Sequence, residues 1–197
     1  MRIDHTIIHT WVEAHSRVLD LGCGDGSLLE SLTREKNIHG YGVEINSENI
    51  LRCVDKKVNV IEQDVDNGLA NFDSQSFDTV IMSQAIQTMV HPDKVLLEML
   101  RVGRQCIVTF PNFGHWRARF QLSFSGRMPV SDLLPYEWYN TPNIHFCTFK
   151  DFDELCQALK ITVINREVVA HKSLSGVLQH ALPNLFGETA LYRITRT

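Results

Sequence analysis

The chain has 197 residues, 44% of them hydrophobic and 21% charged, which is the balance of a globular protein long enough to bury a sizeable core. Its formal net charge of -4 argues against a general nucleic-acid binder, because such proteins carry a basic excess. There is no secretory signal and no apolar run near the ~20 residues that span a bilayer, so we expect a cytoplasmic protein that binds neither nucleic acid nor a membrane.

Helix and strand patterns alternate along the first half of the chain. The spacing of apolar residues predicts helices over 1–14, 27–34, 47–56 and 92–102. Short apolar runs predict strands over 17–21, 39–45, 58–63, 76–83 and 104–110. Ser47 is expected to cap the third of these helices. Strands separated by helices of this length predict a mostly parallel sheet with helices wound on both faces.

The regular alternation stops after Phe110. Residues 111–148 are rich in aromatic residues, arginine, glycine and proline, and they are too long for an ordinary connection, so we expect a functional insertion or lid. A helix over 150–159 and strands over 161–170 and 190–195 follow, which we expect by analogy to close the sheet as an antiparallel pair. The whole chain, 1–197, is expected to form one domain.

A glycine-rich loop follows the first strand, with Gly22, Gly24 and Gly26 in the spacing G-x-G-x-G. A loop of this kind, placed before a helix, brings backbone N–H groups close to a ligand. The dinucleotide fingerprint places its third glycine or alanine one position later, where this chain has Ser27. The loop therefore predicts a ligand site, and its spacing disfavours a dinucleotide.

Acidic residues lie at the ends of the first three strands. Asp20 and Asp25 flank and interrupt the loop, where carboxylates repel a pyrophosphate and attract a cation; one charge pair at 4 Å is worth about 4 kcal/mol at an effective dielectric of ~20. Glu44 is placed to accept hydrogen bonds from both ribose hydroxyls, and Asp64, with Asp66 as the alternative, to meet an adenine amino group. The set predicts S-adenosylmethionine, which carries a sulfonium and an ammonium but no phosphate.

Four segments, 18–26, 42–45, 63–64 and 76–81, resemble the motifs of class I S-adenosylmethionine-dependent methyltransferases. The resemblance implies a Rossmann-like fold in which Asp20 and the glycines hold the methionine part of the ligand. The expected cofactor-binding residues are Asp20, Gly22, Cys23, Gly24, Gly26, Glu44, Ile45, Asp64, Val65 and Ser83. Whether the natural occupant is S-adenosylmethionine or S-adenosylhomocysteine stays open.

No catalytic residue is assigned from the sequence. Methyl transfer depends largely on positioning, and it needs a base only when the acceptor loses a proton early. The segment after the fourth strand lacks the Asn/Asp-Pro-Pro-aromatic motif of many nucleobase and amide methyltransferases; Ser83, Gln84 and Gln87 suit an acceptor, but a polar helix start explains them equally well. The five cysteines have no zinc spacing, so we expect reduced buried thiols and no metal.

The insertion contains Trp, Tyr and Arg, which are enriched in interface hot spots and also suit an acceptor pocket. A lid whose aromatic residues pack on the sheet is an equally reasonable interpretation. The residues expected on an acceptor or partner surface are Asn112, His115, Trp116, Arg117, Arg119, Tyr136 and Trp138.

The run 110–117, Phe-Pro-Asn-Phe-Gly-His-Trp-Arg, resembles the bacterial methionine-biosynthesis protein MetW family, as do 60–64, 83–87 and 98–103. The resemblance covers nearly the whole chain and implies a role with homoserine O-acyltransferase (MetX) between homoserine and methionine. We favour an accessory or regulatory subunit that binds S-adenosylmethionine, because this ligand is a downstream product of the same pathway. The alternative is an active methyltransferase on a small-molecule or protein acceptor.

Overall fold

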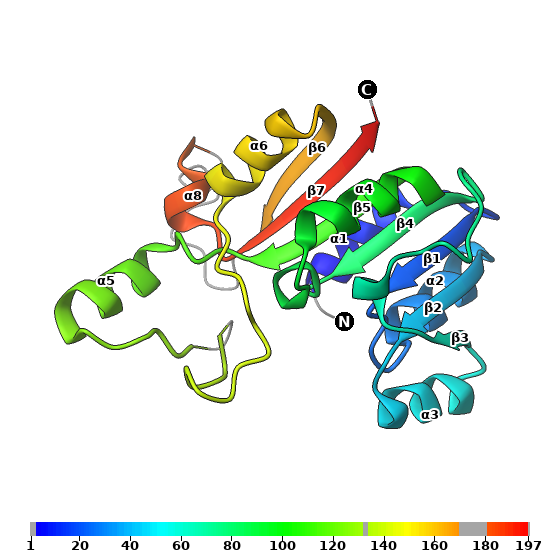
Figure 1. The fold of residues 1–197 in the computed structure, drawn as a ribbon, viewed down its shortest axis with the longest axis horizontal. Helices are drawn as coiled ribbons and strands as arrows, with labels where there is room; N and C mark the ends of the chain where they lie inside the picture. Colours follow the sequence, from blue (N-terminus) through cyan, green and yellow to red (C-terminus); the bar gives the residue numbers. More distant parts are fainter. Residues whose placement is uncertain (1–2, 132–133, 170–180, 197) are drawn as a thin grey trace.

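The computed structural model describes residues 3–131, 134–169 and 181–196, and within them lies a seven-stranded sheet of order β3-β2-β1-β4-β5-β7-β6 (Figure 1). The strands are β1 (Arg17–Leu21), β2 (His39–Glu44), β3 (Asn59–Glu62), β4 (Phe77–Ser83), β5 (Gly103–Pro111), β6 (Ile161–Val169) and β7 (Thr189–Arg196). Strands β1 to β5 are parallel, whereas β7 runs antiparallel to both β5 and β6. The predicted mostly parallel sheet with an antiparallel closing pair is therefore confirmed.

The helices of the described residues are α1 (Ile3–Trp11), α2 (Ser27–Lys36), α3 (Ser47–Asp55), α4 (Pro92–Val102), α5 (Trp116–Ser125), α6 (Phe149–Ala158) and α8 (Pro183–Phe186), with 3-10 turns η1 (Val65–Asn67) and η2 (Ile86–Thr88). Helix α5 lies in the insertion and was not predicted. The capping prediction for Ser47 is wrong by one residue, because Asn46 Oδ1 accepts the hydrogen bond from Asn49 N at 3.1 Å. Among the described residues, no helix is both long and apolar enough to cross a membrane.

Helices cover both faces of the sheet, because successive strand residues point to opposite sides. Leu19 and Leu21 of β1 belong to the apolar cluster formed with α4 and α6. Val18, directly before Leu19, belongs to the cluster on the other face, which includes residues of α1 and α2. Burial on both faces explains why β1, β4 and β5 read as nearly continuous apolar runs.

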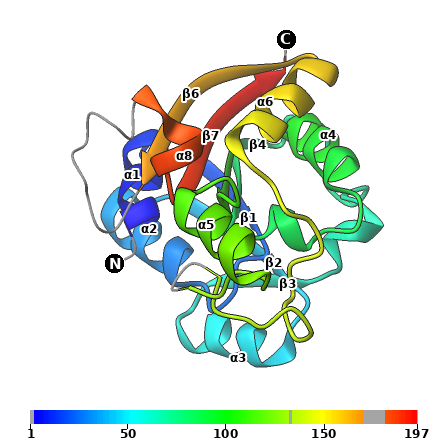
Figure 2. The same cartoon turned by 90° about the vertical axis from the view of Figure 1, so that its left-hand side faces the viewer.

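Residues 116–146, here called the aromatic arm, project from the carboxyl edge of the sheet. Figures 1 and 2 show α5 and the chain after it extending beyond the tip of β5. The arm returns where the backbone N–H groups of Ile144 and His145 both donate to the carbonyl oxygen of Gln87, at 2.9 and 3.0 Å. A capping box at Thr148 then starts α6. The arm is therefore attached next to the strand ends that face the predicted ligand site.

Candidate functional site

The strand order reverses between β1 and β4, because the chain builds β2 and β3 on one side of β1 and β5 on the far side of β4. Open α/β sheets bind ligands outside the carboxyl ends of the strands at such a point. The glycine loop leaves β1 here and the segment 84–88 leaves β4. The two are in close contact, since a Cβ placed on Gly22 would lie 3.1 Å from the Cβ of Ala85.

The glycine loop adopts a backbone that requires glycine at three positions. Gly22, Gly24 and Gly26 have φ values of 67°, 56° and 74°, which side-chain-bearing residues rarely adopt. The N–H groups of Gly22 and Cys23 donate to the carbonyl of Val43 at 2.8 and 3.1 Å, which bends the loop over the end of β2. A Cβ on Gly24 would meet no atom within 4 Å, so the loop borders open space where a ligand can approach the backbone.

Cys23 contributes its backbone to the loop and its side chain to the core. It is 8% exposed, and its Sγ lies 3.9 Å from Sγ of Cys53. A side chain on Gly42 of β2 would collide with this sulfur, so β2 needs a glycine there. Burial raises the pKa of the Cys23 thiol, which therefore stays protonated and supports the loop from below. The five cysteines are free thiols, four of them buried and Cys147 half-buried.

Glu44, at the end of β2, joins this strand to the glycine loop. Its Oε2 accepts from Gly24 N at 2.8 Å, and its Oε1 accepts from Ile45 N and Asn46 N, both at 2.9 Å. A carboxylate offers about four acceptor sites, so three of them are already used. The ribose contact stays a prediction, and accepting both hydroxyls would require the carboxylate to release one backbone bond.

The charge argument expected Asp25 to face a ligand, but its carboxylate is paired within the protein. Lys56 Nζ donates to Asp25 Oδ2 and to Ser27 Oγ, both at 2.6 Å. The Lys56 hydrogen bond lowers the pKa of Asp25 to about 2. The charge of Asp25 is therefore compensated within the protein, and the expectation of a cationic ligand now rests on Asp20, Glu44 and Asp64.

Three further predicted residues lie at strand ends of this edge of the sheet. Asp20 in β1 is 2% exposed and pairs in register with Gly42 and Ile81 on either side, so it lies deep beneath the loop. Ile45 is 61% exposed and offers an apolar surface next to Glu44 on which a flat ring can pack. Ser83 ends β4, and its Oγ lies 3.3 Å from Oγ1 of Thr109.

The structure separates the two candidates for the adenine contact. Both carboxylate oxygens of Asp66 accept from Val90 N, at 2.9 and 3.1 Å, so Asp66 anchors the chain before α4. Asp64 caps η1 through Asp66 N at 2.9 Å, and its second oxygen accepts only from the Asn67 amide at 3.3 Å. Asp64 therefore keeps more acceptor capacity. Val65, between them, is buried.

The segment after β4 contains two unusual residues. Gln84 has φ of 57°, a left-handed conformation that is uncommon for a non-glycine residue and often marks a functional site. Gln87 is 6% exposed; its Nε2 donates to Gln84 O at 2.8 Å, but its buried Oε1 has no hydrogen-bond partner among the described residues. An unmet buried acceptor costs about 1–3 kcal/mol, so Gln87 joins the candidate ligand contacts.

The predicted acceptor or partner residues fall into two groups. Asn112 and His115 are buried, whereas Trp116, Arg117, Arg119, Tyr136 and Trp138 lie at the surface. Asn112 Nδ2 donates to the carbonyls of Asn184 and Gly187, and its Oδ1 accepts from Gly114 N, so this side chain anchors the base of the arm. A surface role is kept only for the exposed group.

His115 starts helix α5. Its Nδ1 accepts from Arg117 N at 3.4 Å, which caps the first turn. Burial lowers the pKa of His115, although the negative charge of Glu188 opposes the shift. The imidazole is therefore neutral near pH 7 and serves as a helix cap.

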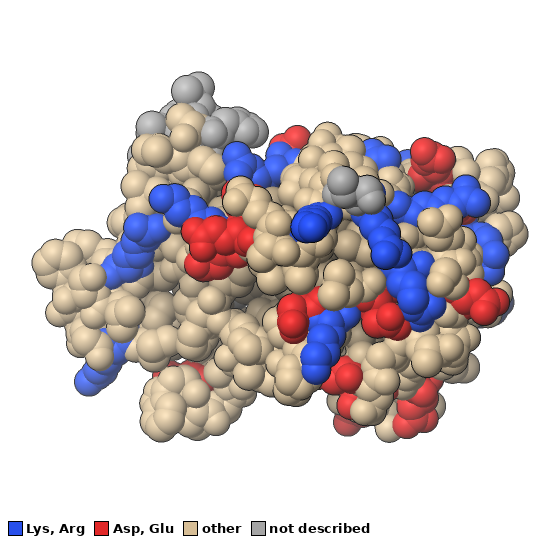
Figure 3. Space-filling model, turned by 45° about the horizontal axis from the view of Figure 1, so that its top comes forward, with Lys and Arg blue, Asp and Glu red and all other residues tan. Residues whose placement is uncertain are grey.

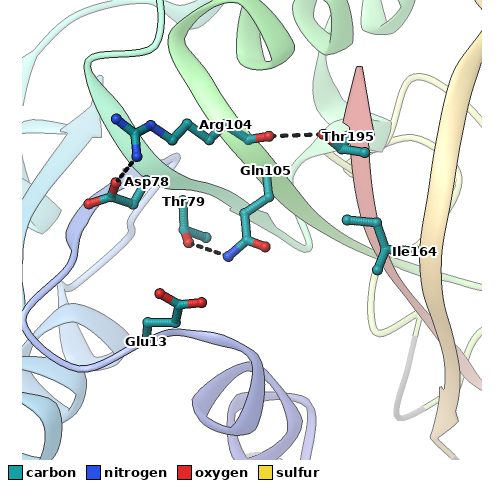
Figure 4. Close-up of a pocket in the computed structure, with 7 residues that line it drawn as sticks. All are labelled: Glu13, Asp78, Thr79, Arg104, Gln105, Ile164 and Thr195. Carbon is teal, nitrogen blue, oxygen red and sulfur yellow. Dashed lines mark hydrogen bonds and ion pairs between the residues drawn. The ribbon is translucent and has the colours of Figure 1, made fainter. Parts of the chain in front are cut away.

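A separate cavity of about 330 Å³ lies at the opposite, amino-terminal edge of the parallel strands (Figure 4). Within its lining, Gln105 Nε2 donates to Thr79 Oγ1 at 2.8 Å, and Arg104 pairs with Asp78 at 3.5 Å. These polar groups largely satisfy one another, and the glycine loop is on the other edge. The carboxyl edge is therefore the candidate site. Among the described residues, no group of three or more His, Cys, Asp or Glu side chains is placed to hold a metal ion.

Comparison with known sequences places this geometry in context. The family model described as "Methionine biosynthesis protein MetW" matches residues 2–194. A relative from Rhodopirellula baltica, named bifunctional methionine biosynthesis protein MetXA/MetW, is 36% identical over 177 residues. The match covers 85% of this chain and 28% of the relative, so the chain spans less than a third of that protein's length.

Several solved structures with the same fold are described as S-adenosylmethionine-dependent methyltransferases. One from Archaeoglobus fulgidus has a TM-score of 0.68 at 15% identity, covering 98% of this chain and 94% of its own. One from Mesorhizobium loti has a TM-score of 0.69 at 14% identity, covering 97% of this chain and 96% of its own. At these identities the likeness shows the fold alone, and the predicted Rossmann-like methyltransferase fold is confirmed.

Proposed function

The chain belongs to the methionine biosynthesis protein MetW family, and we propose that it binds S-adenosylmethionine and acts as an accessory or regulatory subunit of a MetX-like homoserine O-acyltransferase. The cofactor part of the proposal rests on one observation above all. The backbone of Gly24 borders open space at the strand-order reversal, and its N–H group donates a hydrogen bond to the Glu44 carboxylate. Ile45 and Asp64 flank the same space with an apolar surface and an acceptor.

The partner part rests on the relative from Rhodopirellula baltica. Its name joins MetXA to MetW, and 28% of its length matches this chain, which leaves room for a second complete domain. Fusion in one species supports association of separate chains in another, because a tether raises the effective concentration of two domains that already bind.

A second function, methyl transfer, is favoured by Gln87. Its buried Oε1, in the segment after β4, has no hydrogen-bond partner among the described residues, so it has the capacity to accept a hydrogen bond from an acceptor molecule. This proposal predicts conversion of S-adenosylmethionine to S-adenosylhomocysteine when a cell extract supplies the acceptor. If the chain binds the ligand tightly but none of a broad range of acceptors supports turnover, the methyl-transfer proposal is contradicted.

Calorimetric titration with S-adenosylmethionine and S-adenosylhomocysteine tests the cofactor proposal, with Gly24→Ala as the variant. Gly126→Ala is the matched control, because both glycines have positive φ, 56° and 62°, and both border open space, but Gly126 lies in the arm. Both variants carry the same backbone strain, on the order of 1 kcal/mol. We expect only Gly24→Ala to weaken ligand binding, by at least about tenfold. Equal affinities for the two variants would contradict the proposed site.

The partner proposal is tested with the purified acyltransferase. Its activity is measured alone, with this protein, and with this protein plus S-adenosylmethionine. We expect this protein to change the activity and the ligand to modulate that change. No difference in either comparison would exclude an accessory role.

A further inference from the structure

Helix α5 buries none of its residues, although half of it is apolar. Phe120, Leu122 and Phe124 are 57%, 50% and 77% exposed. Isolated helices shorter than about 12–15 residues are marginal in water, and protein helices gain most of their stability by burying one face. A ten-residue helix that presents phenylalanine to solvent therefore lacks a covering surface within the described part of this chain.

The chain after α5 extends the same kind of surface. The exposed large apolar residues of this stretch are Val130, Tyr136, Trp138, Tyr139, Ile144 and Phe146. Two ring pairs are already assembled: Phe120 and Phe124 have centroids 4.3 Å apart, and Trp138 and Tyr139 5.8 Å apart. Exposed aromatic groups that are held in place beforehand are typical of interaction surfaces, because they lose little conformational freedom on binding.

The charge of the arm is opposite in sign to that of the chain. Residues 116–146 carry Arg117, Arg119 and Arg127 against Asp132 and Glu137, whereas the chain as a whole has a net charge of -4. Figure 3 shows the projecting lobe as mostly uncharged, with basic side chains along it. A partner for this surface therefore needs an apolar socket with an acidic rim.

Two occupants can supply an apolar socket, a second copy of this chain or a different protein. A two-fold dimer would bring the arginine-bearing patches of both copies into one interface, where their positive charges would repel one another. An acidic-rimmed partner avoids this repulsion. Between these two occupants, the fused relative favours a different protein, since its name joins MetXA to MetW and this chain matches 28% of its length.

We propose that the outward face of the aromatic arm, centred on Phe120, Phe124 and Trp138, is the docking surface for the MetX-like acyltransferase. This inference rests on the proposed accessory function and adds where the two proteins meet. The arm is then the surface for the partner, and the carboxyl edge of the parallel strands remains for the small-molecule ligand.

The test measures the Kd between the purified acyltransferase and three variants of this chain. Phe124→Asp and Trp138→Ala change the proposed surface, and Val54→Asp is the control, because Val54 is 60% exposed on helix α3, away from the arm. We expect the two arm variants to weaken binding by at least about tenfold, as for interface hot spots, and the control to stay within about twofold. S-adenosylmethionine affinity should be unchanged in all three, which verifies their fold.

Each contrary result has a distinct meaning. Wild-type affinity in both arm variants would overturn the docking surface while leaving the accessory role intact. No binding by the wild-type chain would overturn the accessory role and the docking surface together. A wild-type dimer that Phe124→Asp converts to a monomer, with unchanged acyltransferase binding, would assign the arm to self-association instead.

Discussion

At the scale of single residues, the observed bonds of Glu44 and its proposed ribose contact would compete for the same atoms. Its three bonds from Gly24, Ile45 and Asn46 shape the loop, and the same carboxylate is the expected ribose contact. The sequence identifies such a residue by its place at a strand end. It does not reveal how many acceptor sites the fold has already used, because that depends on loop backbone geometry.

The Asp25–Lys56 pair is a stabilising contact of the loop. Its effect depends on pH in a defined direction, because the pKa of Asp25 is lowered from its ordinary 3.8 to about 2. A carboxyl with a lowered pKa in the folded state stabilises the protein above its unfolded pKa, and this contribution disappears as the pH falls from about 4 toward 2.

We expect Lys56→Met to raise the pKa of Asp25 and to lower the free energy of unfolding at pH 7 by up to about 1 kcal/mol. The magnitude is small because the Asp25 side chain is 45% exposed, so solvent screens the pair. NMR titration of Asp25 and urea denaturation between pH 7 and pH 3 measure the two effects. The stability difference should shrink as the pH falls; a difference that grows would contradict this pairing.

Some residues of the candidate site are recognisable from their neighbours in the sequence, and others only from contacts made in the folded chain. Glycine spacing and acids at strand ends are local patterns, so Gly24, Glu44 and Asp64 could be predicted from the sequence. The engagement of Asp25 by Lys56, 31 positions along the chain, could not, because it arises from how α3 packs beside the loop. Likewise, the lack of a hydrogen-bond partner for Gln87 Oε1 among the described residues is visible only in the folded structure.

At the scale of elements, the strands were the easiest to predict and α5 the hardest. Strands β1, β4 and β5 are buried on both faces, so their apolar runs are visible in the sequence. Helix α5 buries no residue, and its sequence, WRARFQLSFS, therefore lacks the one-sided pattern by which a helix is recognised. Because α5 has no buried face, the sequence pattern did not predict this helix. The same lack of a buried face is the basis for proposing it as a docking surface.

The start of α6 fixes where the arm rejoins the domain. Thr148 Oγ1 accepts from Asp151 N at 3.4 Å, and Asp151 Oδ2 accepts from Thr148 N at 2.9 Å, which completes a capping box. We expect Thr148→Ala to destabilise the protein by about 1 kcal/mol, the usual cost of losing a cap. Thr6→Ala in α1, an exposed position, is the control and should change stability by less than about 0.5 kcal/mol.

Chemical denaturation measures both variants. Because Thr148 is far from α5 in the sequence, its loss should leave Phe120 and Phe124 of that helix in place. If Thr148→Ala changes stability as little as Thr6→Ala, the remaining bond from the backbone N–H of residue 148 to Asp151 Oδ2 is sufficient to cap α6.

At the scale of the whole molecule, the segment after β4 connects the two proposed surfaces. On one side Ala85 touches the glycine loop, where a Cβ on Gly22 would lie 3.1 Å away. On the other side the carbonyl of Gln87 accepts both N–H groups by which the arm returns, those of Ile144 and His145. A ligand that moves this segment therefore acts on the arm directly, through contacts only a few residues apart.

This connection predicts a measurable coupling between ligand and partner. If S-adenosylmethionine changes the affinity for the acyltransferase by some factor, the acyltransferase must change the affinity for S-adenosylmethionine by the same factor. We expect that factor to be at least about five, the lower end of typical allosteric couplings. Titrating each component in the absence and presence of saturating amounts of the other measures both ratios independently.

The Gly24→Ala variant provides the control for this coupling. It is expected to bind the ligand at least about tenfold more weakly while keeping the arm. At a ligand concentration that saturates only the wild-type chain, its affinity for the acyltransferase should therefore respond much less to S-adenosylmethionine. Two equal ratios different from one, absent in the variant, would identify the chain as a ligand-dependent regulator. Ratios of one would mean that the ligand and the partner bind independently, because a ligand that binds both states equally shifts neither. The contact between Gln87 and the arm would then only hold the arm in place.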